Sequence, residues 1–413
     1  MRDLKYLQYF EDLLQVANND LIRQAKEEGK ICAAYLCENT PEPLFNLEGC
    51  FGIRLFAPKT GSTDIATYYM TNYLCETSRA ILERAIEGGY QFADCLIAPD
   101  GCTMINRCAE NIELLSAMGE GNEKFFYEHM ELPLKADDNG VKLLQLQCRN
   151  HILKPLHDRF GIDISDQAIR AAVKEHNRIC QVIRAIGQMR KEEFPRITGY
   201  EFAVLTLATY VCPHHLIIDR LEETLAEIEK REPDQKKYRA RFLLVGAEMD
   251  DPECIKIIEE MGAFVCADRF CFGSYPGREE IALNDEEDAL TQVCRHYVYQ
   301  CQCPRQMNME KVYGRKAYVS KLAKEYAADG IIYDQVKFCD PWAYERVMGA
   351  AMLREDYGYP VLSIDRPYNS HSYYGQLRTR VQAFIESVEI KKLQKERGNK
   401  RSGNKKESKE KSR

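Results

Sequence analysis

The chain has 413 residues, of which 45% are hydrophobic and 29% are charged, and its formal net charge is −7. This length exceeds what one hydrophobic core usually serves, so we expect two or three domains. The acidic balance argues against nucleic acid as the main partner. Arg2, Asp3 and Lys5 follow Met1, and no stretch approaches the roughly 18 apolar residues of a membrane helix. We therefore expect a soluble cytoplasmic protein with no nucleic-acid and no membrane partner.

The elements predicted for the N-terminal part alternate between helix and strand. Helical periodicity covers residues 4–28, 66–88 and 104–118, and short buried strands are predicted at 31–36, 52–56 and 92–98. A turn-rich stretch separates the first two strands. Because such alternation implies a parallel sheet, we predict an N-terminal α/β domain, with a leading helix, over residues 1–162.

The pattern changes after residue 162 and then returns. Long charged helices at 168–191 and 216–231, with little that resembles a strand, predict a helical segment over residues 163–237. Further strands are predicted at 241–246, 263–267, 331–334 and 361–364, with a helix at 252–261. The predicted fold class is therefore α/β, with parallel-sheet domains at 1–162 and 238–390 around a helical middle segment.

Positive charge gathers at the C-terminal end. Residues 391–413 hold eleven Lys and Arg against three Glu, a balance of +8, so residues 1–390 carry −15. Gly398, Ser402 and Gly403 lie among these charges. Such a polar terminus cannot bury enough apolar surface to fold by itself, so we predict a disordered basic tail over residues 391–413.

Seventeen cysteines in a chain with no predicted export signal need an explanation. A reducing cytosol leaves thiols free for metal rather than for disulfides, and these cysteines do not form the CxxC pairs of zinc ribbons. An iron-sulfur protein is the first hypothesis. The alternative for each thiol is packing in the core as a small hydrophobe. We interpret seven cysteines as core thiols, namely Cys32, Cys148, Cys180, Cys212, Cys254, Cys266 and Cys294. Four others are either core thiols or lie near a metal, namely Cys37, Cys50, Cys95 and Cys108.

Several motifs resemble one known family. The run from Cys37 to Leu44, followed by Gly49 and Cys75, resembles the N-terminal signature of the 2-hydroxyacyl-CoA dehydratase and benzoyl-CoA reductase family. Four later motifs agree with it in order and spacing, namely Arg241 to Gly246, Gly262 to Asp268, Lys337 to Pro341, and Gln376 to Arg380 continuing to Glu386. The resemblance covers roughly residues 30–388.

The resemblance implies two Rossmann-like or flavodoxin-like domains, a helical part and a [4Fe-4S] cluster on three cysteines, with one iron open. The matching positions are Cys75, Cys102 and Cys339. Cys102 follows a turn at the end of a predicted strand and Cys339 follows another strand, which are ligand-binding places in an open α/β sheet. Cys75 lies within the helix predicted at 66–88, and its direction is not evident from the sequence.

The resemblance also implies a mechanism and partners. An ATP-hydrolysing iron-sulfur activator supplies one low-potential electron, and the acyl-CoA substrate loses water through a ketyl radical. A homologous second subunit or a homodimer is expected. The enzyme class implied is a 2-hydroxyacyl-CoA dehydratase-like lyase, with a benzoyl-CoA reductase-like oxidoreductase as the alternative.

Two features leave other interpretations open. Cys301-Gln302-Cys303 resembles part of the ligand set of double-cubane [8Fe-9S] proteins, which are ATP-dependent low-potential reductases, although no second cysteine followed by proline stands shortly after Cys75. Glu38 occupies a position that is often serine in active subunits. The chain is therefore also considered as a non-catalytic or electron-relaying partner subunit.

Candidate polar residues are fewer. Glu42, in the turn Pro41-Glu42-Pro43, matches an acidic position of the motif and is the candidate for proton transfer, against the interpretation of a solvated turn residue. For a CoA phosphate the candidates are His371, Arg378 and Arg380, of which the two arginines equally suit surface ion pairs. A metal-storage or redox-sensing protein is a further alternative, based on Cys212, His214 and His215.

Overall fold

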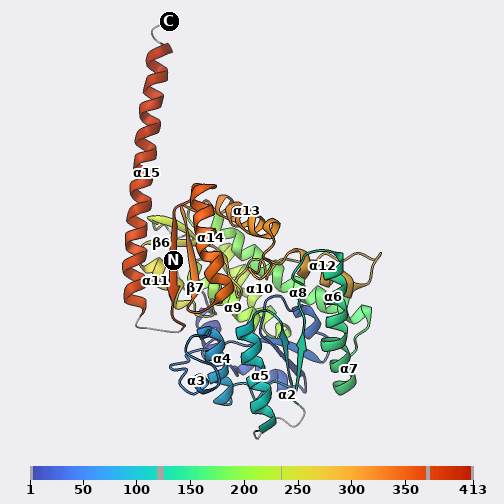
Figure 1. Ribbon diagram of the computed structural model, residues 1–413. Coiled ribbons are helices and arrows are strands. Elements are labelled where there is room, and N and C mark those ends of the chain that lie inside the picture. Colours follow the sequence, from blue (N-terminus) through green and yellow to red (C-terminus); the bar gives the residue numbers. More distant parts are fainter. Residues whose placement is uncertain (1–2, 119–124, 234, 369–372, 411–413) are drawn as a thin grey trace.

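The computed structural model describes residues 3–118, 125–233, 235–368 and 373–410. Two parallel four-stranded sheets organise this part of the chain (Figure 1). The first sheet has the order β2-β1-β3-β4, with strands at Ile31–Tyr35 (β1), Cys50–Arg54 (β2), Cys95–Pro99 (β3) and Phe126–Met130 (β4). The second has the order β6-β5-β7-β8, with strands at Ala240–Gly246 (β5), Ala263–Arg269 (β6), Gly330–Val336 (β7) and Val361–Arg366 (β8). The predicted fold class is confirmed.

Both sheets share one topology. The first strand of each lies between the second and the third, so the direction of winding reverses between β1 and β3 and again between β5 and β7. Open α/β sheets bind ligands outside the carboxyl ends of the strands at such a reversal. The topology therefore provides two potential ligand-binding edges, one for each sheet.

Helices cover both faces of the first sheet. One face packs on α2 (Asp20–Glu27), α4 (Glu76–Ile86) and α5 (Thr103–Met118). The other packs on α6 (Asp138–Cys148), α7 (Lys154–Phe160), α8 (Asp166–Gln188) and α12 (Ala289–Tyr299). Alternate residues of β1 enter the two cores, as period-two side-chain geometry requires. Burial on both faces explains the continuous apolar runs of β1 and β3.

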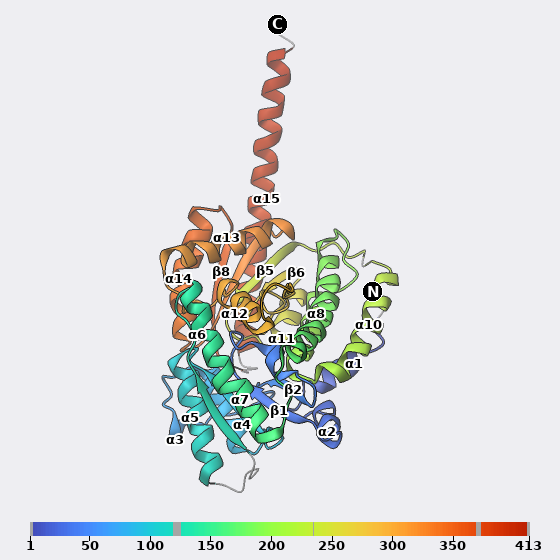
Figure 2. The same cartoon turned by 90° about the vertical axis from the view of Figure 1, so that its right-hand side faces the viewer.

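The second sheet is covered in the same way. On one face lie α11 (Glu253–Glu260) and the first turns of α15 (Tyr374–Glu410), and on the other lie α13 (Met309–Glu325) and α14 (Asp340–Glu355). The rest of α15 stands out from the body of the molecule (Figures 1 and 2). A further core joins α1 (Leu7–Leu13), α8, α9 (Gly199–Val211) and α10 (His214–Lys230). Among the helices of the described residues, none is both long and apolar enough to cross a membrane.

Three expectations from the sequence differ from the structure. The helix predicted at 4–28 is divided into α1 and α2, and the one predicted at 66–88 into α3 (Ala66–Tyr69) and α4. The N–H of Glu76 donates to the carbonyl of Lys337, 3.3 Å away, so a contact with the loop after β7 sets where α4 begins. The tail from residue 391 is helical as far as Glu410, because Lys, Arg and Glu favour helix; residues 411–413 lie outside the described part.

The domain limits predicted from the sequence remain a proposal. One packing contact crosses the limit at residue 238. Helix α12, from the C-terminal part of the chain, packs on α6 and places Leu290 and Val293 in the core of the first sheet. The two halves of the chain therefore share a core.

Candidate functional site

Six cysteines line one pocket between the two sheets. Cys37 follows β1, Cys102 follows β3, Cys271 follows β6 and Cys339 follows β7, so residues after strands of both sheets converge. The six are Cys37, Cys75, Cys102, Cys271, Cys303 and Cys339. The empty volume of this cysteine pocket is about 660 Å³, open solvent at its mouth included. Both reversal points of the topology therefore contribute to one site.

The three cysteines carried over from the resemblance all line this pocket. Cys75 is the N-cap residue of α4, which corrects its expected place inside a longer helix. The Cys339 thiol donates a hydrogen bond to the Cys75 sulfur and lowers the pKa of Cys75 to about 6, helped by the N–H groups of Ser78 and Thr77. The same hydrogen bond, together with burial, raises the pKa of Cys339. Burial raises the pKa of Cys102 to about 12.

The Cys301-Gln302-Cys303 segment is divided between two places. Cys303 lines the cysteine pocket, and burial raises the pKa of its thiol. Cys301 instead donates a hydrogen bond to Asn39 Oδ1, 3.1 Å away, and lines a neighbouring pocket. Of this pair, Cys303 is thus the thiol that joins the other five.

Sequence reasoning missed part of this pocket. Cys271 was not singled out, although it stands two residues beyond β6, the same kind of position as Cys102 after β3. Glu248, in the loop after β5, also lines the pocket and accepts a hydrogen bond from Arg54, 2.8 Å away. Burial raises the pKa of Glu248 to about 7, although Arg54 opposes the rise.

The donor set of the cysteine pocket consists mainly of thiols, which are the ligands that iron-sulfur clusters use. Among the described residues, no three His, Cys, Asp or Glu side chains are grouped closely enough to hold one metal ion. In a cluster each thiolate binds a different iron, so the thiols surround a volume instead of meeting at a point. Six thiols around one pocket therefore have the donor chemistry that such a cluster uses.

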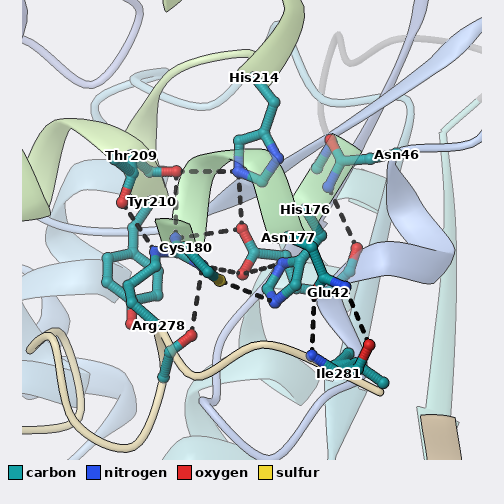
Figure 3. Close-up of polar contacts among 12 residues, drawn as sticks. Glu42, Asn46, His176, Asn177, Cys180, Thr209, Tyr210, His214, Arg278 and Ile281 are labelled. Carbon is teal, nitrogen blue, oxygen red and sulfur yellow. Dashed lines mark hydrogen bonds and ion pairs between the residues drawn. The ribbon is translucent and has the colours of Figure 1, made fainter. Parts of the chain in front are cut away.

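Glu42 lies in a buried network of polar contacts and is not a solvated turn residue (Figure 3). Arg278 donates to both carboxylate oxygens, at 2.5 and 3.2 Å, and His214 Nε2 lies 3.0 Å from Oε1. His176 Nδ1 lies 3.8 Å from Oε2. Burial raises the pKa of Glu42, but Arg278 and His214 lower it more, and the net pKa is well below its usual range. The role of Glu42 in proton transfer remains a prediction.

A second pocket adjoins the cysteine pocket. We call it the side pocket; its lining includes Tyr35, Glu38, Thr40, Glu42, His176 and His296. Its empty volume is about 510 Å³ by the same measure. Glu38 and Asn39 line both pockets, so the loop after β1 forms the wall between them. Burial lowers the pKa of His176 to about 3 and that of His296 to about 4, so both rings are neutral near pH 7.

The remaining candidates lie elsewhere. Asn19 donates to the Cys212 sulfur, His214 contacts Glu42, and His215 contacts Glu28, so these three side chains have separate partners. Arg378 forms a surface ion pair with Glu260 at 2.9 Å, and Arg380 donates to the Ser363 carbonyl. His371 lies outside the described residues. Cys50, Cys95 and Cys108 are buried in the cores of the first sheet.

Two doubly wound parallel sheets with a cysteine pocket between their carboxyl ends define a class of α/β protein with a thiol-rich cleft. Comparison with known families narrows that class. Residues 37–388 match the family described as 2-hydroxyglutaryl-CoA dehydratase, D-component, and the chain belongs to this family. The resemblance inferred from the motifs is thereby confirmed.

Known relatives agree with this assignment. The chain is 23% identical to the (R)-phenyllactyl-CoA dehydratase beta subunit of Clostridium sporogenes over 93% of its own length and 99% of that protein. It is 22% identical to a benzoyl-CoA reductase subunit of Thauera aromatica, over 86% of this chain and 90% of that protein. It is 21% identical to the beta subunit of (R)-2-hydroxyglutaryl-CoA dehydratase from Acidaminococcus fermentans, over 89% of this chain and 95% of that protein. The expected enzyme class, a dehydratase-like enzyme, is confirmed at that level.

Proposed function

We propose that this chain is the iron-sulfur subunit of a 2-hydroxyacyl-CoA dehydratase-type enzyme, which removes water from an acyl-CoA. One observation carries the proposal. Cys75, Cys102 and Cys339 are separated by up to 264 residues in the sequence and line one pocket at the carboxyl ends of both sheets. Membership of the dehydratase D-component family supports the same function.

In this proposal the three cysteines hold a [4Fe-4S] cluster. When bound, the cluster supplies low-potential one-electron transfer, which an ATP-hydrolysing iron-sulfur activator would drive. The chain itself provides the thiolates and a dry setting. Leu36, Met104, Ile105 and Trp342 line the pocket with apolar surface, which excludes water and strengthens electrostatic interactions within it. A homologous second subunit or a second copy of the chain completes the enzyme, in keeping with relatives named as subunits.

The test is the iron and acid-labile sulfide content per chain after anaerobic purification, with EPR of the reduced protein. About four irons in the wild type, lost in both Cys102→Ala and Cys339→Ala, are expected for one cluster. The matched control is Cys180→Ala, a buried thiol of α8 outside the cysteine pocket, which should keep its iron. Absence of iron from the wild type, with cluster supply during expression verified, would refute the proposal.

A second candidate function rests on the number of cysteines. Six thiols line the pocket, three more than the single-cluster assignment uses. Together with Cys75, Cys102 and Cys339, the additional thiols Cys37, Cys271 and Cys303 would hold a double-cubane [8Fe-9S] cluster, as in ATP-dependent low-potential reductases. About eight irons per chain, with iron lost from Cys303→Ala as well, would favour this function over the dehydratase.

A further inference from the structure

The side pocket holds buried polar atoms that have no hydrogen-bond partner within the described part of the chain. They are the Tyr35 hydroxyl, both carboxylate oxygens of Glu38, the Thr40 hydroxyl and His176 Nδ1. Tyr35, Thr40 and His176 are each 1% exposed, and the Glu38 side chain is 5% exposed. Buried polar groups are nearly always paired in folded proteins, because leaving them unpaired costs free energy. Four such side chains around one pocket therefore point to a polar ligand.

The position of these side chains connects the ligand with the cysteine pocket. Tyr35 is the last residue of β1, and Glu38 and Thr40 lie in the loop that follows it, at the reversal point of the first sheet. Glu38 lines both pockets. The side pocket therefore lies next to the cysteine pocket, with Glu38 in contact with both.

Glu38 keeps its capacity to accept hydrogen bonds. Its nearest cation is Arg269, 3.9 Å away, beyond hydrogen-bond distance, and Arg269 donates elsewhere, to the carbonyl of Gln302. Glu42 differs, because Arg278 and His214 already occupy its carboxylate (Figure 3). Glu38 is thus the acidic residue of the side pocket that is ready to accept hydrogen bonds from a ligand.

The charge of the side pocket determines what kind of ligand end it suits. Its lining includes Glu38, Glu279 and Glu42, of which Glu42 is already paired with Arg278. None of the described lining residues is Lys or Arg. A carboxylate at the end of a ligand would face acidic groups without a cation in the lining, and an alkyl or phenyl end would leave the polar atoms unpaired. A hydroxyl, amide or ammonium group would instead donate to Glu38.

We propose that the side pocket binds the far end of the acyl group and selects acyl-CoA substrates whose acyl group ends in a hydrogen-bond donor. This inference rests on the proposed function and adds the class of acyl group. Glu38 accepts from the terminal donor. Thr40, Tyr35 and neutral His176 complete its hydrogen bonds, while the thioester remains on the side of the cysteine pocket. The proposed specificity depends on Glu38 having no hydrogen-bond partner within the described part of the chain, which the sequence motif alone does not indicate.

The test measures binding, not turnover, on anaerobically purified protein with its iron content verified. Isothermal titration compares 4-hydroxybutanoyl-CoA with pentanoyl-CoA, in which a methyl group replaces the hydroxyl, and with glutaryl-CoA, in which a carboxylate replaces it. We expect the hydroxyl ester to bind about tenfold more tightly than either, because each of the others leaves buried polar groups unpaired or repelled. Similar dissociation constants for the three esters would overturn the inference, and so would absence of binding by all three.

Two variants show whether the pocket residues cause the preference. Glu38→Gln keeps the size of the side chain and removes its charge, and Thr40→Val removes a hydroxyl with little change in shape. In Glu38→Gln we expect the preference over glutaryl-CoA to fall to about threefold or less. In Thr40→Val we expect the preference over pentanoyl-CoA to fall by the same amount. Glu48→Gln, at an exposed glutamate, is the matched control and should retain both. An unchanged preference in both variants would overturn the assignment, whereas the iron content tests the proposed function separately.

Discussion

At the scale of single residues, the ion pair of Glu42 and Arg278 joins positions 236 residues apart. Both side chains are buried, and Arg278 also donates to Thr209 Oγ1 at 2.8 Å. Removing one partner from a buried pair is costly, because it leaves the other charge without compensation. The pair therefore fixes the loop after β1, which carries Glu38, against the segment after β6.

We expect Glu42→Gln to lower the free energy of unfolding by about 3–5 kcal/mol, since it leaves the Arg278 guanidinium buried without a counter-charge. Urea denaturation at pH 7 measures the change. Glu48→Gln, an exposed glutamate six residues away, should stay within about 0.5 kcal/mol of the wild type. A loss below about 1 kcal/mol in Glu42→Gln would mean that the pair is not needed for stability.

The sequence pattern predicted some residues of the site, but not those whose position depends on contacts between distant parts of the chain. Cys102 and Cys339 each stand three residues after the end of a strand, so their place at the carboxyl end of a sheet follows from the topology. Their role as ligands stays a prediction. The burial of Glu42 depends on Arg278, and the inclusion of Cys271 and Cys303 depends on how the two sheets meet. No local pattern reports such contacts between distant parts of the chain.

At the scale of elements, most strands follow from apolar runs. Seven of the eight strands were predicted within a few residues, because parallel strands buried on both faces are continuously apolar. The missed strand, β4, lies at the edge of its sheet and contains Glu128 and His129, which interrupt the apolar signal. The division between α3 and α4 was missed because helical periodicity continues across it, while a contact with Lys337 starts the second helix.

Helix α15 combines a packed part and a projecting part. Leu377, Val381, Phe384, Ile385 and Val388 are buried against the second sheet and α11, whereas Leu393 is 54% exposed. We expect truncation after Leu393 to leave the melting temperature within about 2 °C of the full chain, because the truncated chain keeps this packing. Phe384→Ala should instead cost about 3–5 kcal/mol, since Phe384 stacks on Phe242 with ring centroids 4.9 Å apart.

Calorimetry on both variants tests this division of α15. A circular dichroism spectrum with reduced helix content in the truncated chain would show that the removed part is helical in solution. A large drop in melting temperature on truncation would contradict the assignment, because the projecting part would then carry packing of its own.

At the scale of the whole molecule, the two halves of the chain are bound by more than the proposed cluster. Ile281, Leu290, Val293 and Val298 lie in the core of the first sheet, although they belong to the C-terminal half in sequence. Arg54 and Glu248 add an ion pair between the halves at 2.8 Å. Burying each of the four apolar side chains contributes about 1.5–3 kcal/mol. Their sum of about 6–12 kcal/mol is comparable to the net stability of a typical domain.

The fragment of residues 1–237 is therefore not expected to fold when it is produced without the rest. It would expose the surface of α6 and the sheet that α12 covers, so we expect aggregation or a non-cooperative thermal transition in size-exclusion chromatography and calorimetry. Co-expression with residues 238–413 should restore a soluble complex with one transition, while the chain truncated after Leu393 serves as the matched control. A monodisperse 1–237 fragment with a cooperative transition of its own would instead support the domain limit at residue 238. In that case α12 would be a helix docked on a core that forms without it.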